Sequence, residues 1–229
     1  MLVWDGCVNV RDLGGLPREN GGETEFGIAV RADSLGGLTD SGWKTLAAYG
    51  VTSGIDLRGD HELDGTRPRI PITRIPITPR TGAGWEWPSM RDAYLATLEE
   101  FRPQFAAAVA ALAKGAPPVL VHCQGGRDRT GLVAALVLRA AGVDVESIAA
   151  DHALSDESWA PYNVSWFEAA TEPEERARRQ RVAAPAGRTM VEVLAEVERR
   201  YGGVREVLGS TSHIDTLVLR LRGDSTDRQ

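Results

Sequence analysis

Short apolar runs separated by turn residues predict strands in the first third of the chain. Three of these runs have the length of a strand, at residues 26–32, 51–57 and 69–77. The prolines in the last run favour a position at the edge of a sheet. Residues 38–50 have the spacing of a helix, which Thr39 would cap and Gly50 would end. A further strand is expected to begin at Asn9 and to end at a Gly-Gly turn.

Helical spacing dominates the remainder of the chain. Apolar residues recur every three or four positions from Met90 to Lys114, which predicts one long helix kinked at Pro103. Residues 116–123 form a short apolar run of the kind that is buried in a sheet with helices on both faces. Further helices are predicted for residues 130–141, 145–154 and 190–222, and a loop for residues 78–89.

Strands that alternate with helices predict a single α/β domain over residues 1–229, with a central, mostly parallel sheet flanked by helices. Residues 155–188 combine aromatic residues, acids and a cluster of arginines, and we expect them to form a helical insertion. The insertion is either a lid over an apolar pocket or an amphipathic helix pair that completes the core. The sequence leaves both alternatives open.

Composition and charge exclude several classes of protein. A chain of 229 residues with 42% hydrophobic residues can build a core without disulfides or a structural metal. The net charge of −6 argues against nucleic acid as a partner. The longest apolar run, residues 105–113, is far shorter than the roughly 18 residues of a membrane span, so no stable membrane insertion is expected. The N-terminus lacks the pattern of a signal peptide, which favours the cytoplasm and leaves secretion without such a peptide open.

The candidate chemistry lies in residues 119–131, where a strand leads to Cys123 and a glycine-rich turn opens a helix. Backbone N–H groups from Gln124 to Arg129 can curl around one tetrahedral anion if Gly125 and Gly126 supply unusual backbone dihedrals. Arg129 can clamp two oxygens of a phosphate with its planar guanidinium. The residues expected to contact the phosphate are therefore Gln124, Gly125, Gly126, Arg127 and Thr130.

The backbone N–H groups and the Arg129 guanidinium create a positive field around Cys123. This field favours the thiolate of Cys123, which makes it a nucleophile toward phosphorus. A covalent phosphocysteine is the natural intermediate, and neither a cofactor nor a metal is needed. The second cysteine, Cys7, is expected to pack in the core rather than act as a redox partner.

The motif Cys-x5-Arg followed by Thr-Gly, with His122 before the cysteine, resembles the signature loop of protein tyrosine phosphatases. Two further motifs are similar to the bacterial tyrosine and lipid phosphatase branch of that family, Asn9-x-Arg-Asp-Leu-Gly-Gly and Asp56-Leu-Arg-x-x-x-Glu62. The resemblance runs from about residue 8 to residue 209 and implies the cysteine-based phosphatase fold. It departs at Arg127, where the family usually has lysine.

The resemblance implies that Asp128, inside the loop, protonates the leaving group. Asp92 is a rival, because Trp87-Pro88 precedes it as in a separate acid loop, but it more simply decorates the start of a helix. His122 is expected to orient the loop. Thr130 can donate a hydrogen bond to the sulfur of Cys123.

Asp56 and Arg58 follow a predicted strand, and they either line the pocket or form an internal ion pair. The sequence thus predicts metal-independent hydrolysis of phosphate monoesters, with a protein tyrosine or dual-specificity phosphatase as the first interpretation. Phosphoinositides and small phosphate esters remain alternative substrates. A silent phosphate-binding module is disfavoured because Cys123 and Arg129 are both retained. A sulfurtransferase or arsenate reductase is disfavoured because Asp128, Thr130 and the two flanking motifs belong to the phosphatase pattern. The sequence does not predict the oligomeric state.

Overall fold

The computed structural model describes residues 1–79, 87–209 and 212–224, and within them the chain forms a sheet of the order β1-β2-β5-β3-β4. The strands are β1 (Arg11–Asp12), β2 (Ala29–Ala32), β3 (Ser53–Asp56), β4 (Ile72–Arg74) and β5 (Val119–His122). β1 pairs antiparallel with β2, and the other pairs are parallel. The predicted α/β fold with a mostly parallel sheet is confirmed. The strand that leads to Cys123 lies at the centre, and the proline-flanked strand β4 lies at an edge, as expected.

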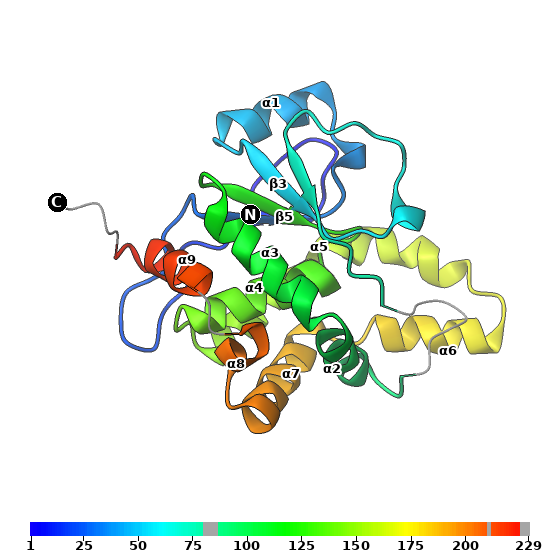
Figure 1. Cartoon of the computed structure of the whole chain (residues 1–229). Coiled ribbons are helices and arrows are strands. Elements are labelled where there is room, and N and C mark those ends of the chain that lie inside the picture. The colour runs from blue at the N-terminus through cyan, green and yellow to red at the C-terminus, as the bar shows by residue number, and fades with distance from the viewer. Residues whose placement is uncertain (80–86, 210–211, 225–229) are drawn as a thin grey trace.

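Helices cover both faces of this sheet (Figure 1). They are α1 (Asp40–Ala48), α2 (Met90–Glu100), α3 (Arg102–Lys114), α4 (Asp128–Ala140), α5 (Val145–Glu168), α6 (Pro173–Val182), α7 (Ala186–Tyr201), α8 (Val204–Leu208) and α9 (Ser212–Arg222). Successive residues of β5 point to opposite faces, so Val119 and Val121 join the cluster under α3 and α4 while Leu120 joins the cluster under α1. Burial on both faces explains why this strand is apolar throughout.

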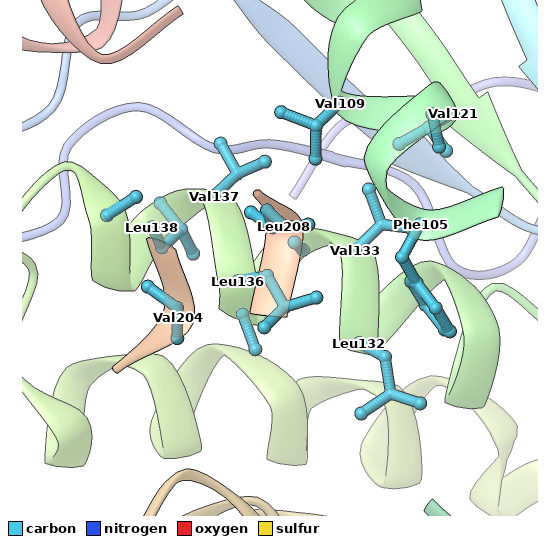
Figure 2. Close-up of a cluster of buried hydrophobic side chains, with 14 of the residues drawn as sticks. Phe105, Val109, Val121, Leu132, Val133, Leu136, Val137, Leu138, Val204 and Leu208 are labelled. Carbon is cyan, nitrogen blue, oxygen red and sulfur yellow. The ribbon is translucent and has the colours of Figure 1, made fainter. Parts of the chain in front are cut away.

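Helix α4 lies in the middle of the larger cluster. Ten of its 13 residues are buried. Figure 2 shows Val133 and Val137 of this helix near Phe105 and Val109 of α3, with Val121 of β5 alongside. Dense packing on all sides fixes α4, and with it the position at which its first turn meets the end of β5.

Three of the helix predictions differ clearly from the structure. Residues 90–114 form two helices that break at Phe101, because Pro103 lies in the first turn of α3, where the missing N–H of a proline breaks no helical hydrogen bond. Helix α5 continues through Pro161 to Glu168 instead of ending near residue 154. Residues 190–222 form not one helical region but α7, α8 and α9, and Gly202 ends the first of them at φ +77°.

The N-cap of α1 is confirmed, since the hydroxyl of Thr39 accepts a hydrogen bond from the N–H of Gly42 at 3.2 Å. Residues 80–86 of the expected loop lie outside the described residues. In the part of the chain that the structure describes, no helix has the length and apolar character that crossing a membrane requires.

Candidate active site

The end of β5 delivers Cys123 to the loop that precedes α4. We call residues 123–129 the cysteine loop. The Cys123 side chain is buried, and the neighbouring His122 ring lies with Nδ1 3.3 Å from the carbonyl oxygen of Cys123 and with Nε2 3.9 Å from the Asp56 carboxylate. Burial lowers the pKa of His122 despite the nearby carboxylate, so the ring is neutral at pH 7. His122 therefore lies next to the loop, and its role in orienting the loop stays a prediction.

Hydrogen bonds from other segments hold the carbonyl groups of the cysteine loop. The donors are the Ser34 N–H to Gln124 O at 3.0 Å, Asn9 Nδ2 to Gly125 O at 3.0 Å, Trp159 Nε1 to Gly125 O at 2.8 Å and Arg31 Nη2 to Gly126 O at 2.8 Å. The C=O and N–H groups of a trans peptide point in opposite directions. The N–H groups that follow these carbonyl groups therefore point away from the segments that hold the loop.

No described residue accepts a hydrogen bond from the backbone N–H groups of residues 124–129. The loop, at the N-terminus of a buried helix, can thus act as an anion nest. Gly126 makes this shape possible, because its φ is +64° and a Cβ atom there would lie 2.5 Å from the carbonyl oxygen of Ala32. Gly125 does not adopt a positive φ, so the expectation of unusual dihedrals at both glycines was wrong for this one.

Arg129 is held by Glu62 on one edge of its guanidinium. Nη1 and Nη2 each lie 2.6 Å from an oxygen of the Glu62 carboxylate, and Nη1 also contacts the carbonyl oxygen of Ile77 at 3.2 Å. Burial raises the pKa of Glu62, but the hydrogen bonds from Arg129 and Gly59 outweigh it and hold that pKa below its ordinary value. Within the described residues, the Nε–H and one Nη2–H of Arg129 have no acceptor. This free edge can take two oxygens of a phosphate.

A buried arginine cluster lies beneath the cysteine loop and consists of Arg11, Arg31 and Asp151. The carboxylate of Asp151 accepts from Arg11 Nε at 2.6 Å and from Arg31 Nη1 at 2.7 Å, and both arginines are almost fully buried. Burial and the charge of Arg11 lower the pKa of Arg31 to about 10, and Asp151 opposes the shift. The Arg31 guanidinium is therefore still charged at pH 7. Two cations against one carboxylate leave positive charge behind the nest.

Asp128 is the first residue of α4, and its half-exposed carboxylate lies at the rim of the nest. It accepts a hydrogen bond from the hydroxyl of Tyr94, and Arg127 Nη1 lies 3.5 Å away.

Asp92 has a different environment. Its carboxylate accepts from the hydroxyl of Ser89 at 2.6 Å, and Ser89 caps α2, so Asp92 is part of a helix start as expected.

The side chain of Arg127 is directed at helical segment 155–188. Its Nε donates to Asp156 at 2.8 Å, and its two Nη atoms donate to the carbonyl groups of Val182 and Ala184, each at 2.7 Å. Three protein acceptors therefore occupy this guanidinium, and the backbone N–H of Arg127 remains as its donor toward an anion. The prediction that Arg127 contacts the phosphate did not distinguish its side chain from its backbone.

Thr130, Asp56 and Arg58 are all buried. The hydroxyl of Thr130 makes no hydrogen bond to any described residue, so the expected bond to the Cys123 sulfur is not formed here. The guanidinium of Arg58 donates hydrogen bonds of 3.0 to 3.1 Å to the Asp56 carboxylate and one of 2.9 Å to the hydroxyl of Ser34. Of the two roles considered for Asp56 and Arg58, the geometry is that of the internal ion pair.

Two pockets open on either side of Asp128. The Arg129 pocket has a volume of about 180 Å³ and is lined by polar Arg129, Glu62 and Asp128 and by apolar side chains that include Tyr94, Met90 and Leu132. The Trp159 pocket has a volume of about 720 Å³ and is lined by Gln124, Gly125, Arg127, Trp159, Tyr162 and Trp166. The described residues include no cluster of three or more histidine, cysteine or acidic side chains that could hold a metal ion.

Comparison with known proteins decides the family. Residues 2–222 match the family model for the tyrosine phosphatase family. The chain belongs to the tyrosine phosphatase family. The predicted membership of this family, the predicted fold and the predicted phosphatase function are confirmed. The phosphatase is a hydrolase of phosphorylated substrates.

Curated relatives of this phosphatase agree. A tyrosine-protein phosphatase of Nostoc commune is 32% identical over 218 residues, which cover 84% of this chain and 72% of the relative. The triple specificity protein phosphatase PtpB of Mycobacterium tuberculosis is 30% identical over 171 residues, 58% of this chain and 62% of the relative. A putative tyrosine-protein phosphatase of Cupriavidus necator is 28% identical over 180 residues, 71% and 65% respectively. The chain thus spans less than two thirds of the last two relatives.

Several residues around the nest of this phosphatase were not predicted as site residues. Glu62 and Asn9 had been quoted only as parts of motifs, and the motifs were the available signal for both. Tyr94 and Trp159 had no such signal, because each was one aromatic residue in a helical pattern. They reach the cysteine loop only through the tertiary fold.

Proposed function

We propose that this phosphatase hydrolyses phosphate monoesters through a phosphocysteine on Cys123. The observation that supports this most directly is the run of backbone N–H groups without a described acceptor that follows the buried Cys123, together with the free edge of Arg129. The thiolate attacks phosphorus and forms the S–P bond while the ester P–O bond breaks. The N–H groups and Arg129 stabilise the negative charge on the three remaining oxygens.

Asp128 supplies the proton in this proposal. Its carboxylic acid gives a proton to the departing ester oxygen, and its carboxylate then takes a proton from the water that attacks the phosphocysteine. The second attack breaks the S–P bond and releases inorganic phosphate and the thiolate. The unpaired hydroxyl of Thr130 is available to stabilise the sulfur as it leaves. Every step uses protein groups and water, so the proposal needs no metal or cofactor.

For the substrate we propose phosphotyrosine in a protein. The Arg129 pocket combines the phosphate-binding arginine with apolar walls, which suit an aromatic leaving group. Phosphoserine, phosphothreonine and phosphoinositides are the alternatives, and triple specificity in the name of the mycobacterial relative describes that protein. A panel of phosphorylated peptides and inositol lipids ranks these classes by kcat/KM.

We also propose that helical segment 155–188 is a lid. Its aromatic residues Trp159, Trp166 and Phe167 are only half-buried and belong to neither hydrophobic core cluster, and α6 has no buried residue. Arg178 and Val182 of this segment line the Arg129 pocket. Figure 1 shows α6 and the end of α5 extending beyond the helices that cover the sheet. Val182 and Ala184 of the segment pack against the larger core cluster, but its aromatic side chains do not, and this fits a lid better than an ordinary core helix pair.

The nucleophile is tested by Cys123→Ser, with Cys7→Ser as the matched control. The serine variant should keep the nest and bind inorganic phosphate, yet lose turnover and the initial burst of phenol, because a hydroxyl without a base is a weak nucleophile. Cys7→Ser should turn over normally, since burial and the neighbouring Asp33 raise the pKa of the Cys7 thiol and keep it protonated. Turnover by Cys123→Ser within about tenfold of wild type would overturn the proposal.

A further inference from the structure

Tyr94 joins the cysteine loop to a second buried side chain. This tyrosine is on α2, is 3% exposed, and donates its hydroxyl hydrogen to the Asp128 carboxylate. On its other side the hydroxyl oxygen lies 3.4 Å from Nε2 of His152, which is on α5 and 1% exposed. The two rings meet edge to face, with centroids 6.0 Å apart and an interplanar angle of 81°. The result is a chain of contacts from His152 through Tyr94 to Asp128.

The protonation states of these groups suit a fixed donor. Burial raises the pKa of Tyr94 well above its ordinary value, and the nearby Asp128 charge adds to the shift, so the phenol keeps its hydrogen. Burial and the surrounding arginines lower the pKa of His152 well below its ordinary value, so the ring is neutral. Because the Tyr94 hydrogen goes to Asp128, a neutral His152 can contact the Tyr94 oxygen through Nε2 without adding a charge beside Asp128.

Gly131 makes room for this arrangement. A Cβ atom on Gly131 would lie 2.3 Å from Cε1 and 2.4 Å from Nδ1 of His152. The glycine of the Thr-Gly pair therefore allows the histidine ring to pack against the first turn of α4. The close packing of His152, and with it its contact to Tyr94, therefore depends on the absence of a side chain at residue 131.

We infer that Tyr94 is a positioning residue for the acid Asp128, and that His152 fixes the Tyr94 hydroxyl. The inference rests on the proposed role of Asp128. Asp128 is half-exposed, and on the first turn of a helix its carboxylate has several staggered orientations available. A hydrogen bond from an immobile phenol selects one of them. Arg127, the other neighbour, contacts the carboxylate only at 3.5 Å and is held by its own acceptors.

The test compares kcat/KM for a series of aryl phosphates in Tyr94→Phe. This ratio reports the steps up to cleavage of the P–O bond, and only poor leaving groups need the proton. We expect a loss of about tenfold for phenols of high pKa and almost none for phenols of low pKa, because a misplaced acid loses part of its contribution of about 10²–10⁴. The control is Tyr49→Phe, which removes a similar hydrogen bond to Asp12 of 2.7 Å, and it should leave the leaving-group dependence unchanged.

A double-mutant cycle separates positioning from structure. In the Asp128→Asn background, Tyr94→Phe should have no further effect on the leaving-group dependence, since the group it positions is gone. An equal loss for all leaving groups, or none, in Tyr94→Phe would overturn the inference while a steep dependence in Asp128→Asn keeps the proposed function. No steepening in Asp128→Asn would overturn the acid assignment, and the role of Tyr94 with it.

Folding is checked by cooperative unfolding, and a second pair of variants covers a failure. If Tyr94→Phe does not fold, His152→Leu and His152→Gln replace it. The glutamine amide can reach the place of Nε2 and leucine cannot, so His152→Leu should steepen the leaving-group dependence and His152→Gln should restore part of it. The same dependence as wild type in both variants would overturn the role of His152 and the positioning inference.

Discussion

Asp151→Asn tests whether the buried arginine cluster stabilises the fold beneath the cysteine loop. The substitution keeps the shape of the side chain and removes the negative charge. Arg11 and Arg31 are 3% and 1% exposed, so two guanidinium groups would then be buried without a counterion. The carbonyl oxygen of residue 151 would still accept from Arg11 Nη2 at 2.7 Å, but the amide replaces one carboxylate oxygen with an N–H donor, so a hydrogen bond to one of the two arginines is lost together with the charge.

Removing one partner of a buried ion pair destabilises a protein by about 3–5 kcal/mol. We expect a loss in that range for the free energy of unfolding, measured by urea denaturation at pH 7. Asp215→Asn is the control, because its pair with Arg205 has the similar length of 2.7 Å but side chains that are 62% and 44% exposed. An exposed pair contributes less than about 1 kcal/mol. Equal, small losses in both variants would refute the reasoning.

The pH dependence gives the same test a second readout. Burial raises the pKa of Asp151, but the two arginines outweigh it and hold that pKa below its ordinary value. The stabilisation is therefore fully present above the unfolded pKa of about 3.9 and is lost as the pH falls through the lower folded pKa. The difference in unfolding free energy between wild type and Asp151→Asn should stay constant from pH 7 to pH 5 and narrow below about pH 3.9. A difference that narrows already between pH 7 and pH 5 would contradict it.

Three further predictions concern Glu62, Asp92 and helical segment 155–188. Glu62→Gln should lower kcat/KM by about tenfold in steady-state assays, because a neutral amide cannot hold both Nη groups of Arg129, and unchanged kinetics would show that the anchor is dispensable. Asp92→Asn should leave the leaving-group dependence of kcat/KM as it is, whereas a steeper dependence would move the acid to α2. Replacing residues 163–180 with a short Gly-Ser linker should leave one cooperative unfolding transition and speed the inactivation of Cys123 by peroxide. Loss of that transition would show that the segment belongs to the core.

Local chemistry made much of the fold predictable. The cap of α1 depends only on Thr39 and the following N–H groups, and the apolar run of β5 reports burial on both faces. The prediction ended a helix near residue 154, whereas α5 continues past Pro161, although a proline inside a helix usually breaks it. Here the residue is exposed on α5, where water can hydrate the carbonyl group that loses its helical partner.

The site was predictable where one short segment builds it and unpredictable where distant segments meet. The order Cys123, glycine and Arg129 within seven residues indicated the nest. The bond between Arg11 and Asp151 joins residues 140 positions apart, and the bond between Tyr94 and Asp128 joins residues 34 positions apart. No periodicity in the sequence reports such pairs, since they depend on how the helices pack. The same limit explains why the partner of Arg127 was not foreseen.

The bonds that hold the carbonyl groups of the cysteine loop have a consequence for the end of the reaction. They come from Asn9, Arg31, Ser34 and Trp159, so the cradle is complete before any substrate arrives. Its ordering entropy is part of folding, not of binding. A preformed cradle recognises the tetrahedral oxyanion itself, and inorganic phosphate has the same shape and charge as the group that it replaces. We therefore expect the product to compete with the substrate, so the phosphate content of the surroundings sets how fast this enzyme works.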